Sequence, residues 1–222
     1  MPDTSFDSAK RAEYGIVCGT DEAGRGPLCG PVVAAAVVLP DDSTSDELTR
    51  AGLNDSKKLS EKKREQLYDL ILEKASAYGI AEASPEEIDA YNILAASLLA
   101  MRRAVESVRE TVCPGIVLAD GNRLTDFGVP AEAVVHGDAL SPSIAAASVL
   151  AKVTRDRIMT ALAEEYPGYG LERHKGYPTW EHKLAVFERG AAPIYRRTFL
   201  GFLERDREKL EAALRKKKEE AE

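Results

Sequence analysis

The alternation of apolar and polar residues divides the chain into short strands and amphipathic helices. Two apolar runs, residues 15–20 and 32–39, predict two strands, and because the second is apolar throughout we expect it to be buried on both faces. Further strands are expected at 78–82, 116–120 and 133–137. Three strands in succession, followed by an alternation of helix and strand, indicate an α/β fold with a mixed central β-sheet flanked by helices.

Apolar side chains that recur at intervals of three and four residues predict the helices. The expected helices begin at serine or threonine residues that suit the N-terminal cap, and proline directly follows the cap in two of them. We expect helices from Ser60 onward, from Ser84 to about Val108 with a bend near Asn92, from Ser141 onward, and over residues 179–189.

The same pattern divides the chain into one domain with two appendages. Residues 1–14 form a polar N-terminal segment, residues 15–200 form the domain, and residues 201–222 are expected as a charged C-terminal helix. Within the domain, 40–45 and 166–178 are expected to be loops. A chain of 222 residues is long enough for one domain with a substantial core.

Composition and charge narrow the class of protein. No apolar run approaches the ~20 residues that span a bilayer, and residues 1–10 lack the apolar core of a secretory signal. We therefore expect a cytoplasmic protein without membrane contact. Cys18, Cys29 and Cys113 are well separated, which favours buried reduced thiols over zinc ligands or disulfides. The net charge of −7 argues against a generally basic nucleic-acid-binding surface, but clustered Lys and Arg residues leave room for a local basic groove.

The turn after the first predicted strand concentrates chemically active side chains in the sequence Asp21-Glu22-Ala23-Gly24-Arg25-Gly26-Pro27. Two carboxylates at the mouth of a buried sheet repel each other, and a divalent cation is the usual means of keeping both ionised. Glycines let the backbone approach a ligand, and an arginine offers donors to phosphate. Acidic residues and glycines are also common at ordinary turns. Asp21 and Glu22 can share a metal only if the strand ends or bulges between them, since successive strand side chains point to opposite faces.

Two further aspartates follow predicted strands. Asp120 ends the fourth strand and Asp138 directly follows the fifth. If the first, fourth and fifth strands are neighbours, Asp21, Glu22, Asp120 and Asp138 converge at one end of the sheet. Carboxylates without attendant Cys or His favour Mg²⁺ or Mn²⁺ over zinc, and the natural chemistry is two-metal phosphodiester hydrolysis that leaves 5′-phosphate and 3′-hydroxyl ends. Each aspartate alone also suits a structural role, Asp120 in a turn and Asp138 near a helix start.

Motifs spread from about Gly19 to Phe199 resemble those of bacterial ribonuclease HII, a type 2 ribonuclease H. They occur in the expected order. The matching blocks are Asp21 to Pro27, Asn54 to Ser60, Asp120-Gly121-Asn122, Gly137-Asp138-Ala139, Ala145 to Asp156, His174 to Thr179 and Arg196 to Phe199.

The resemblance implies a ribonuclease H-like catalytic domain over 15–200. It implies endonucleolytic hydrolysis of the RNA strand of RNA–DNA hybrids and incision 5′ to single ribonucleotides embedded in duplex DNA. By resemblance, the metal-binding catalytic acids are Asp21, Glu22, Asp120 and Asp138. The turn that grips the ribonucleotide is Gly24-Arg25-Gly26, and the residue that stacks on the following sugar is Tyr177. Lys57 is expected either to meet a backbone phosphate or to be a solvated surface lysine.

Other readings of the same residues remain open. Ribonuclease HIII would be expected to carry an acid other than aspartate at position 138, and we set it aside because this residue is Asp138. Another ribonuclease H-fold nuclease would cut all-DNA junctions and would give Tyr177 no role. A non-catalytic hybrid-binding module would bind without metal-dependent turnover. We expect a monomer without an obligate protein partner, and the C-terminal helix shows no sliding-clamp-binding pattern.

Overall fold

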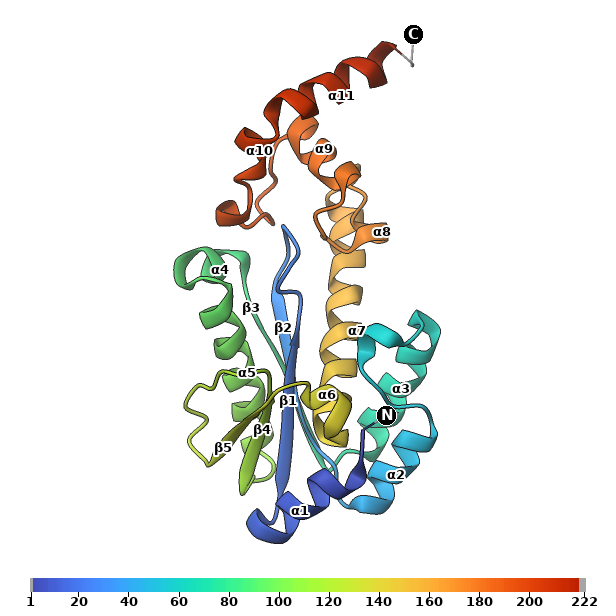
Figure 1. Ribbon diagram of the computed structural model, residues 1–222, viewed down its shortest axis with the longest axis vertical. Coiled ribbons are helices and arrows are strands. Elements are labelled where there is room, and N and C mark those ends of the chain that lie inside the picture. Colours follow the sequence, from blue (N-terminus) through green and yellow to red (C-terminus); the bar gives the residue numbers. More distant parts are fainter. Residues whose placement is uncertain (1, 220–222) are drawn as a thin grey trace.

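Five strands form one mixed sheet in the computed structural model, which describes residues 2–219. The strand order is β3-β2-β1-β4-β5 (Figure 1). β1 runs antiparallel to β2 and parallel to β4, β2 and β3 are antiparallel, and β4 and β5 are parallel. The first, fourth and fifth strands are therefore neighbours, which is the condition stated above for the acidic residues to converge. The bounds are β1 (Val17–Ala23), β2 (Val32–Val38), β3 (Ala77–Ala83), β4 (Ile116–Asp120) and β5 (Ala131–Val134).

Helices cover both faces of this sheet (Figure 1). Every residue of β2 is buried, as its unbroken apolar sequence predicts, because α5 packs on one face and α7 on the other. One face is covered by α4 (Pro85–Tyr91) and α5 (Ile93–Arg109), and the other by α2 (Asp42–Arg50), α3 (Glu61–Lys74) and α7 (Pro142–Glu165).

The small side chains at the start of α7 allow it to lie directly on β1. Ala145, Ala146 and Ala147 are fully buried. A Cβ at Gly19 would lie 2.3 Å from the backbone nitrogen of Ile144, so only glycine fits there. This close approach places the start of α7 beside the strand that carries Asp21 and Glu22.

The chain before β1 is helical rather than irregular. Residues 4–14 form α1 (Thr4–Tyr14), whose N-terminal cap Asp3 accepts from the N–H of Ser5. Most of the predicted loop at 40–45 opens α2 in the same way, with Asp41 accepting from the N–H of Thr44. The loop prediction for 42–45 was therefore wrong, because Asp41 within this polar stretch caps a helix.

The fifth strand also ends earlier than predicted. β5 stops at Val134, His136 takes a left-handed conformation with φ 57°, and α6 (Gly137–Leu140) follows. Asp138 therefore lies in a short helix and not at a strand end. The N–H of Gly137 donates to the Asp120 carboxylate instead of continuing a strand ladder.

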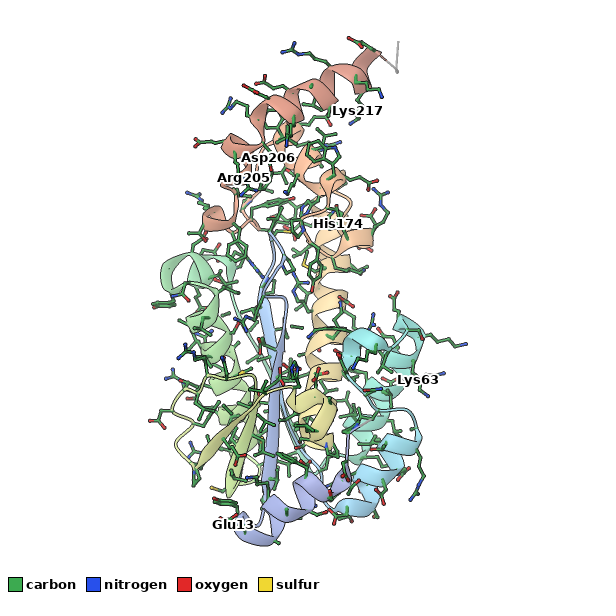
Figure 2. All side chains as sticks on the ribbon, viewed as in Figure 1. Glu13, Lys63, His174, Arg205, Asp206 and Lys217 are labelled. Carbon is green, nitrogen blue, oxygen red and sulfur yellow. The ribbon has the colours of Figure 1, made fainter. Side chains whose placement is uncertain are left out.

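The C-terminal segment packs on the far end of α7, beyond the sheet, and its last helices project as an arm (Figure 1). Its elements are α8 (Leu171–His174), α9 (Trp180–Arg189), η2 (Arg197–Phe199), α10 (Phe202–Arg205) and α11 (Arg207–Glu219). Figure 2 shows Arg205 and Asp206 where the arm begins and Lys217 near its outer end. The predicted C-terminal helix is thus interrupted at Asp206, and residues 220–222 lie outside the described part.

Two of the three thiols are buried as predicted. Cys18 and Cys29 lie in the core, whereas Cys113 is exposed between α5 and β4, and all three are free. Burial raises the pKa of Cys18 and Cys29 to about 12, so neither is a reactive thiolate. Within residues 2–219, no helix is both long and apolar enough to cross a membrane.

Candidate active site at the end of β1 and β4

β1 carries two acidic side chains just past the last residue at which it pairs with β4. The parallel ladder between the two strands ends at Thr20 and Ala119, while β1 stays paired with β2 through Ala23. The strand neither ends nor bulges between Asp21 and Glu22, contrary to the condition expected for a shared site. The two side chains nevertheless line one hollow, together with Asp120 at the end of β4.

Most of the residues singled out in the sequence meet at this hollow, of about 250 Å³. Glu22 and Asp120 also reach a smaller hollow on the α5 side of the sheet, together with Ser97 and Arg123. Asp138 does not line the first hollow, although its carboxyl group lies close enough to sense the charge of Asp120. The predicted residues that do line it are Asp21, Glu22, Gly24, Arg25, Gly26, Lys57, Asp120 and Tyr177.

The acidic side chains are held where ionisation is unfavourable. Asp21 is only 6% exposed, and burial, followed by the charges of Glu22 and Asp120, raises its pKa well above the ordinary range. Burial also raises the pKa of Glu22. For Asp138, burial and then the charge of Asp55 raise the pKa. A cation at this place would relieve the cost of keeping these groups ionised.

Lys57 supplies part of that positive charge. It lies in the loop that includes η1 (Ser56–Lys58), and burial alone would lower its pKa. The surrounding carboxylates, Asp21 first, outweigh the burial and leave the pKa raised. Lys57 is an exposed residue at the rim of the hollow, and the neighbouring carboxylates stabilise its protonated form.

The donor set suits a hard divalent cation, but the protein does not close a cage around one. Within residues 2–219, no group of three or more His, Cys, Asp or Glu side chains is arranged so as to hold a metal ion by itself. Asp120 is oriented by the N–H of Gly137 at 2.7 Å, and Asp21 accepts from the N–H of Glu22 at 2.7 Å. Such an open arrangement of carboxylates leaves coordination positions for water and substrate oxygens, as Mg²⁺ sites usually do.

The glycine-rich turn and Tyr177 form the opposite wall. Arg25 pairs with Glu22 at 3.2 Å. A Cβ at Gly26 would lie 3.5 Å from Tyr177 Cε1, so the ring lies over the turn while the side chain stays 44% exposed. The carbonyl of Tyr177 accepts from the N–H of Thr179 and from His182, which fixes its backbone.

Two residues at the site were not found from the sequence. Lys152, on α7, lines the hollow and pairs with Asp156 at 2.6 Å, and burial lowers its pKa. Asp55 lies beside Asp138. Both lie in motif blocks identified in the sequence, Asn54 to Ser60 and Ala145 to Asp156. The sequence did offer one sign of the ion pair, because Lys152 and Asp156 are four residues apart on a predicted helix.

His174 contacts the backbone of the Tyr177 segment, where its carbonyl accepts from the N–H of Tyr177 and its Nδ1 from the N–H of Gly176. It stacks on His182 with ring centroids 4.1 Å apart, and Figure 2 shows it in the C-terminal segment near the end of α7. It is not among the residues that line the hollow.

The chain is similar to known proteins over the region that contains this site. The family model described as ribonuclease HII matches residues 18–201. Ribonuclease HII of Azoarcus sp. (strain BH72) is 57% identical over 184 residues, which cover 83% of this chain and 87% of the relative. The solved ribonuclease H2 from Pyrococcus horikoshii OT3 has a TM-score of 0.69 at 29% identity and covers 90% of this chain and 99% of its own. Ribonuclease HII from Archaeoglobus fulgidus, solved in complex with PCNA, has a TM-score of 0.66 at 27% identity, with 82% and 93% covered. The matched residues 18–201 include every candidate site residue described above.

Proposed function

The chain belongs to the ribonuclease HII family and is a ribonuclease H, and we propose that it also incises duplex DNA on the 5′ side of single embedded ribonucleotides. Hydrolysis would use two metal ions and leave 5′-phosphate and 3′-hydroxyl ends. The observation that carries the proposal is the meeting of Asp21, Glu22 and Asp120 with Gly24–Gly26 and Tyr177 at one hollow. An acidic patch and a surface that can recognise a sugar thus lie within reach of one nucleotide.

The family is metal-dependent, and we propose Mg²⁺ or Mn²⁺ as the cofactor. Four carboxylates would hold it, those of Asp21, Glu22, Asp120 and Asp138. Without a bound cation the pKa values of Asp21, Glu22 and Asp138 are raised, so a cation would favour their ionised forms. When bound, such ions supply an activated water and stabilise the leaving 3′ oxygen. The N–H of Gly137 would keep the Asp120 carboxylate oriented.

The opposite wall would select the substrate. A 2′-hydroxyl distinguishes RNA from DNA, and the backbone of Gly24–Gly26 can reach it without obstruction from a side chain. The Tyr177 ring would lie against the next sugar and disfavour a second hydroxyl there. Lys57 and Lys152 line the same hollow and are placed to meet phosphates.

A non-catalytic hybrid-binding module is the less favoured function. Buried carboxylates that repel one another destabilise a fold, and a protein that only bound duplexes would gain nothing from them. We further propose a cytoplasmic monomer that needs no obligate protein partner, since a monomer leaves the wall of the hollow open to a duplex.

The test uses a labelled DNA duplex with one ribonucleotide, an all-DNA duplex of the same sequence, and Mg²⁺. Wild type should make a single nick 5′ to the ribonucleotide and leave the all-DNA duplex intact. Asp138→Asn should lose the activity, whereas Asp69→Asn, at an exposed position on α3, should retain it. Cutting restricted to long RNA runs would contradict the proposed recognition, and folded protein inactive with Mg²⁺ and Mn²⁺ would contradict catalysis by this site.

A further inference from the structure

Two arginines that the catalytic site does not use are completely enclosed beneath the glycine-rich turn. Arg155, on α7, is 1% exposed and Arg196, just before η2, is 0% exposed. Buried arginines normally face a carboxylate. Within the described residues neither guanidinium has a carboxylate within 4.0 Å, and Asp156, the nearest in sequence, pairs with Lys152 and Arg64 instead.

Backbone carbonyls take the place of that carboxylate. Arg196 uses its planar fork to bind five carbonyl oxygens, all of them in the connection between β1 and β2. These are the carbonyls of Gly24 (2.7 Å), Pro27 (2.8 Å), Gly30 (3.0 Å), Arg25 (3.1 Å) and Pro31 (3.2 Å). Such a set of bonds fixes the turn from behind, and a lysine could not reproduce it because its ammonium carries only three donors.

Arg155 connects the same turn to the segment that carries Tyr177. It donates to the carbonyls of Cys29 and Pro31 on one side and to the carbonyl of Lys175 on the other, at 3.0–3.2 Å. A Cβ at Gly24 would lie 2.0 Å from its Nε, so the turn rests on the guanidinium itself. The two halves of the recognition wall are therefore held by one buried side chain.

Because the peptide bond is planar, the hydrogen bonds made by Arg196 also set the direction of N–H groups in the turn. In a trans peptide the carbonyl and the following N–H point in opposite directions, and the described chain has no cis peptide. Because the carbonyls of Gly24 and Arg25 point to Arg196, the N–H groups of Arg25 and Gly26 point away from it. Within the described residues these two N–H groups have no acceptor, and both residues line the hollow.

We propose that Arg196 and Arg155 are positioning residues for ribonucleotide recognition, which aim the N–H groups of Arg25 and Gly26 at the substrate and fix their distance from Tyr177. The inference deepens the proposed function and rests on it. We place neither arginine in contact with substrate or metal. Since no described carboxylate lies within 4.0 Å of either guanidinium, their positive charge also favours a phosphate at the turn. Burial and the charge of Arg155 lower the pKa of Arg196 to about 9, so it remains protonated at neutral pH.

The experiment measures discrimination between ribose and deoxyribose by the holoenzyme with Mg²⁺. KM is determined for nicking of the duplex with one ribonucleotide, and Ki for the all-DNA duplex as a competitive inhibitor. The ratio Ki/KM reports recognition of the 2′-hydroxyl. Both constants come from one preparation, so a partly unfolded sample does not alter the ratio.

Arg196→Lys should lower Ki/KM by about tenfold, the equivalent of one hydrogen bond to the ribose, mostly through KM rather than kcat. Arg155→Lys should lower it in the same direction, and it serves as the second variant if Arg196→Lys does not fold. The matched control is Arg197→Lys, since Arg197 adjoins Arg196 in sequence but is exposed, and it should keep the wild-type ratio.

One measurement needs no variant. Hydrogen exchange of the Arg25 and Gly26 amides in the wild type should be slowed more by the ribonucleotide-containing duplex than by all-DNA. An unchanged Ki/KM in folded Arg196→Lys and Arg155→Lys, or equal protection by both duplexes, would overturn the inference while leaving the proposed function intact. A wild type that does not discriminate would overturn both.

Discussion

The carboxylate of Asp7, in α1, accepts a hydrogen bond from the N–H of Ser143 at the start of α7, over 2.9 Å. Asp7 is fully buried, and the N–H of Asp3 donates to the carbonyl of Leu140 nearby. Helix α1 thus holds the junction of α6 and α7, directly after Asp138. This helix lies outside residues 18–201, which the family model matches.

Asp7→Ala should therefore destabilise the protein. The substitution leaves the buried N–H of Ser143 without its acceptor, and an unsatisfied buried donor costs about 1–2 kcal/mol. Urea unfolding of the metal-free protein would measure it. Glu13→Ala is the control, because Glu13 is an exposed residue of the same helix (Figure 2). Equal stability of the two variants would show that α1 does not support α7 through Asp7.

Asp21→Asn should stabilise the metal-free protein while abolishing cleavage. Burial and neighbouring charges raise the pKa of Asp21, so the folded form binds a proton more readily than the unfolded chain. Stability in EDTA is therefore expected to fall as the pH rises from the ordinary pKa of 3.8 towards the raised value. The amide cannot titrate, so the variant should show a flatter dependence and be more stable than the wild type at pH 7.

Unfolding in urea with EDTA at several pH values from 4 to 8 would show this difference. Asp69→Asn should follow the wild type at every pH. If Asp21→Asn is less stable than the wild type throughout, the acidic cluster is not a source of strain in the absence of metal.

Local sequence signals predicted most of this fold because they act between near neighbours. Ser84 and Glu87 form a reciprocal capping box exactly where Ser84-Pro85 predicted a helix start, and Asn92 separates α4 from α5 where a bend was expected. β2 is buried on both faces, as its apolar sequence required. These features depend on residues within one or two turns of each other.

The missed features depend on residues far apart in the sequence. Asp7 is a polar residue in a polar segment, and its partner Ser143 lies 136 positions away. The carbonyls that Arg196 binds lie 165–172 positions away, so nothing in its neighbourhood distinguishes it from the exposed Arg197. Burial of a charged side chain is decided by the assembled fold rather than by local pattern.

Lys57→Gln should weaken binding of every duplex and reduce its dependence on salt. One phosphate contact contributes about 0.9 to the slope of log K against log salt concentration. We therefore expect the slope to fall by roughly one unit, with the same change for a duplex with and without a ribonucleotide. Lys62→Gln, at an exposed position on α3, is the control. An unchanged slope for Lys57→Gln would show that Lys57 does not contact a phosphate and interacts only with the acidic side chains.

His182 makes the Tyr177 segment sensitive to acid. Its Nδ1 donates to the carbonyl of Tyr177 at 2.9 Å, and its Nε2 shares a hydrogen bond of 2.8 Å with the hydroxyl of Tyr195. Burial lowers the pKa of His182 to about 4 from the ordinary 6.5. The unfolded chain therefore binds a proton at higher pH than the folded protein does, and stability is lost as the pH falls from about 6.5 towards 4.

The expected loss from this residue reaches about 3 kcal/mol at pH 4. His182→Gln should be less stable than the wild type at pH 7, because the ring packing and the bond to Tyr195 are lost, but its stability should fall less between pH 6.5 and 4. His136→Asn is the matched control, since His136 is exposed and its left-handed backbone suits asparagine. This control should keep the wild-type slope. A slope unchanged in His182→Gln would mean that the acid sensitivity arises elsewhere, and Tyr177 would then have a support that does not depend on the imidazole.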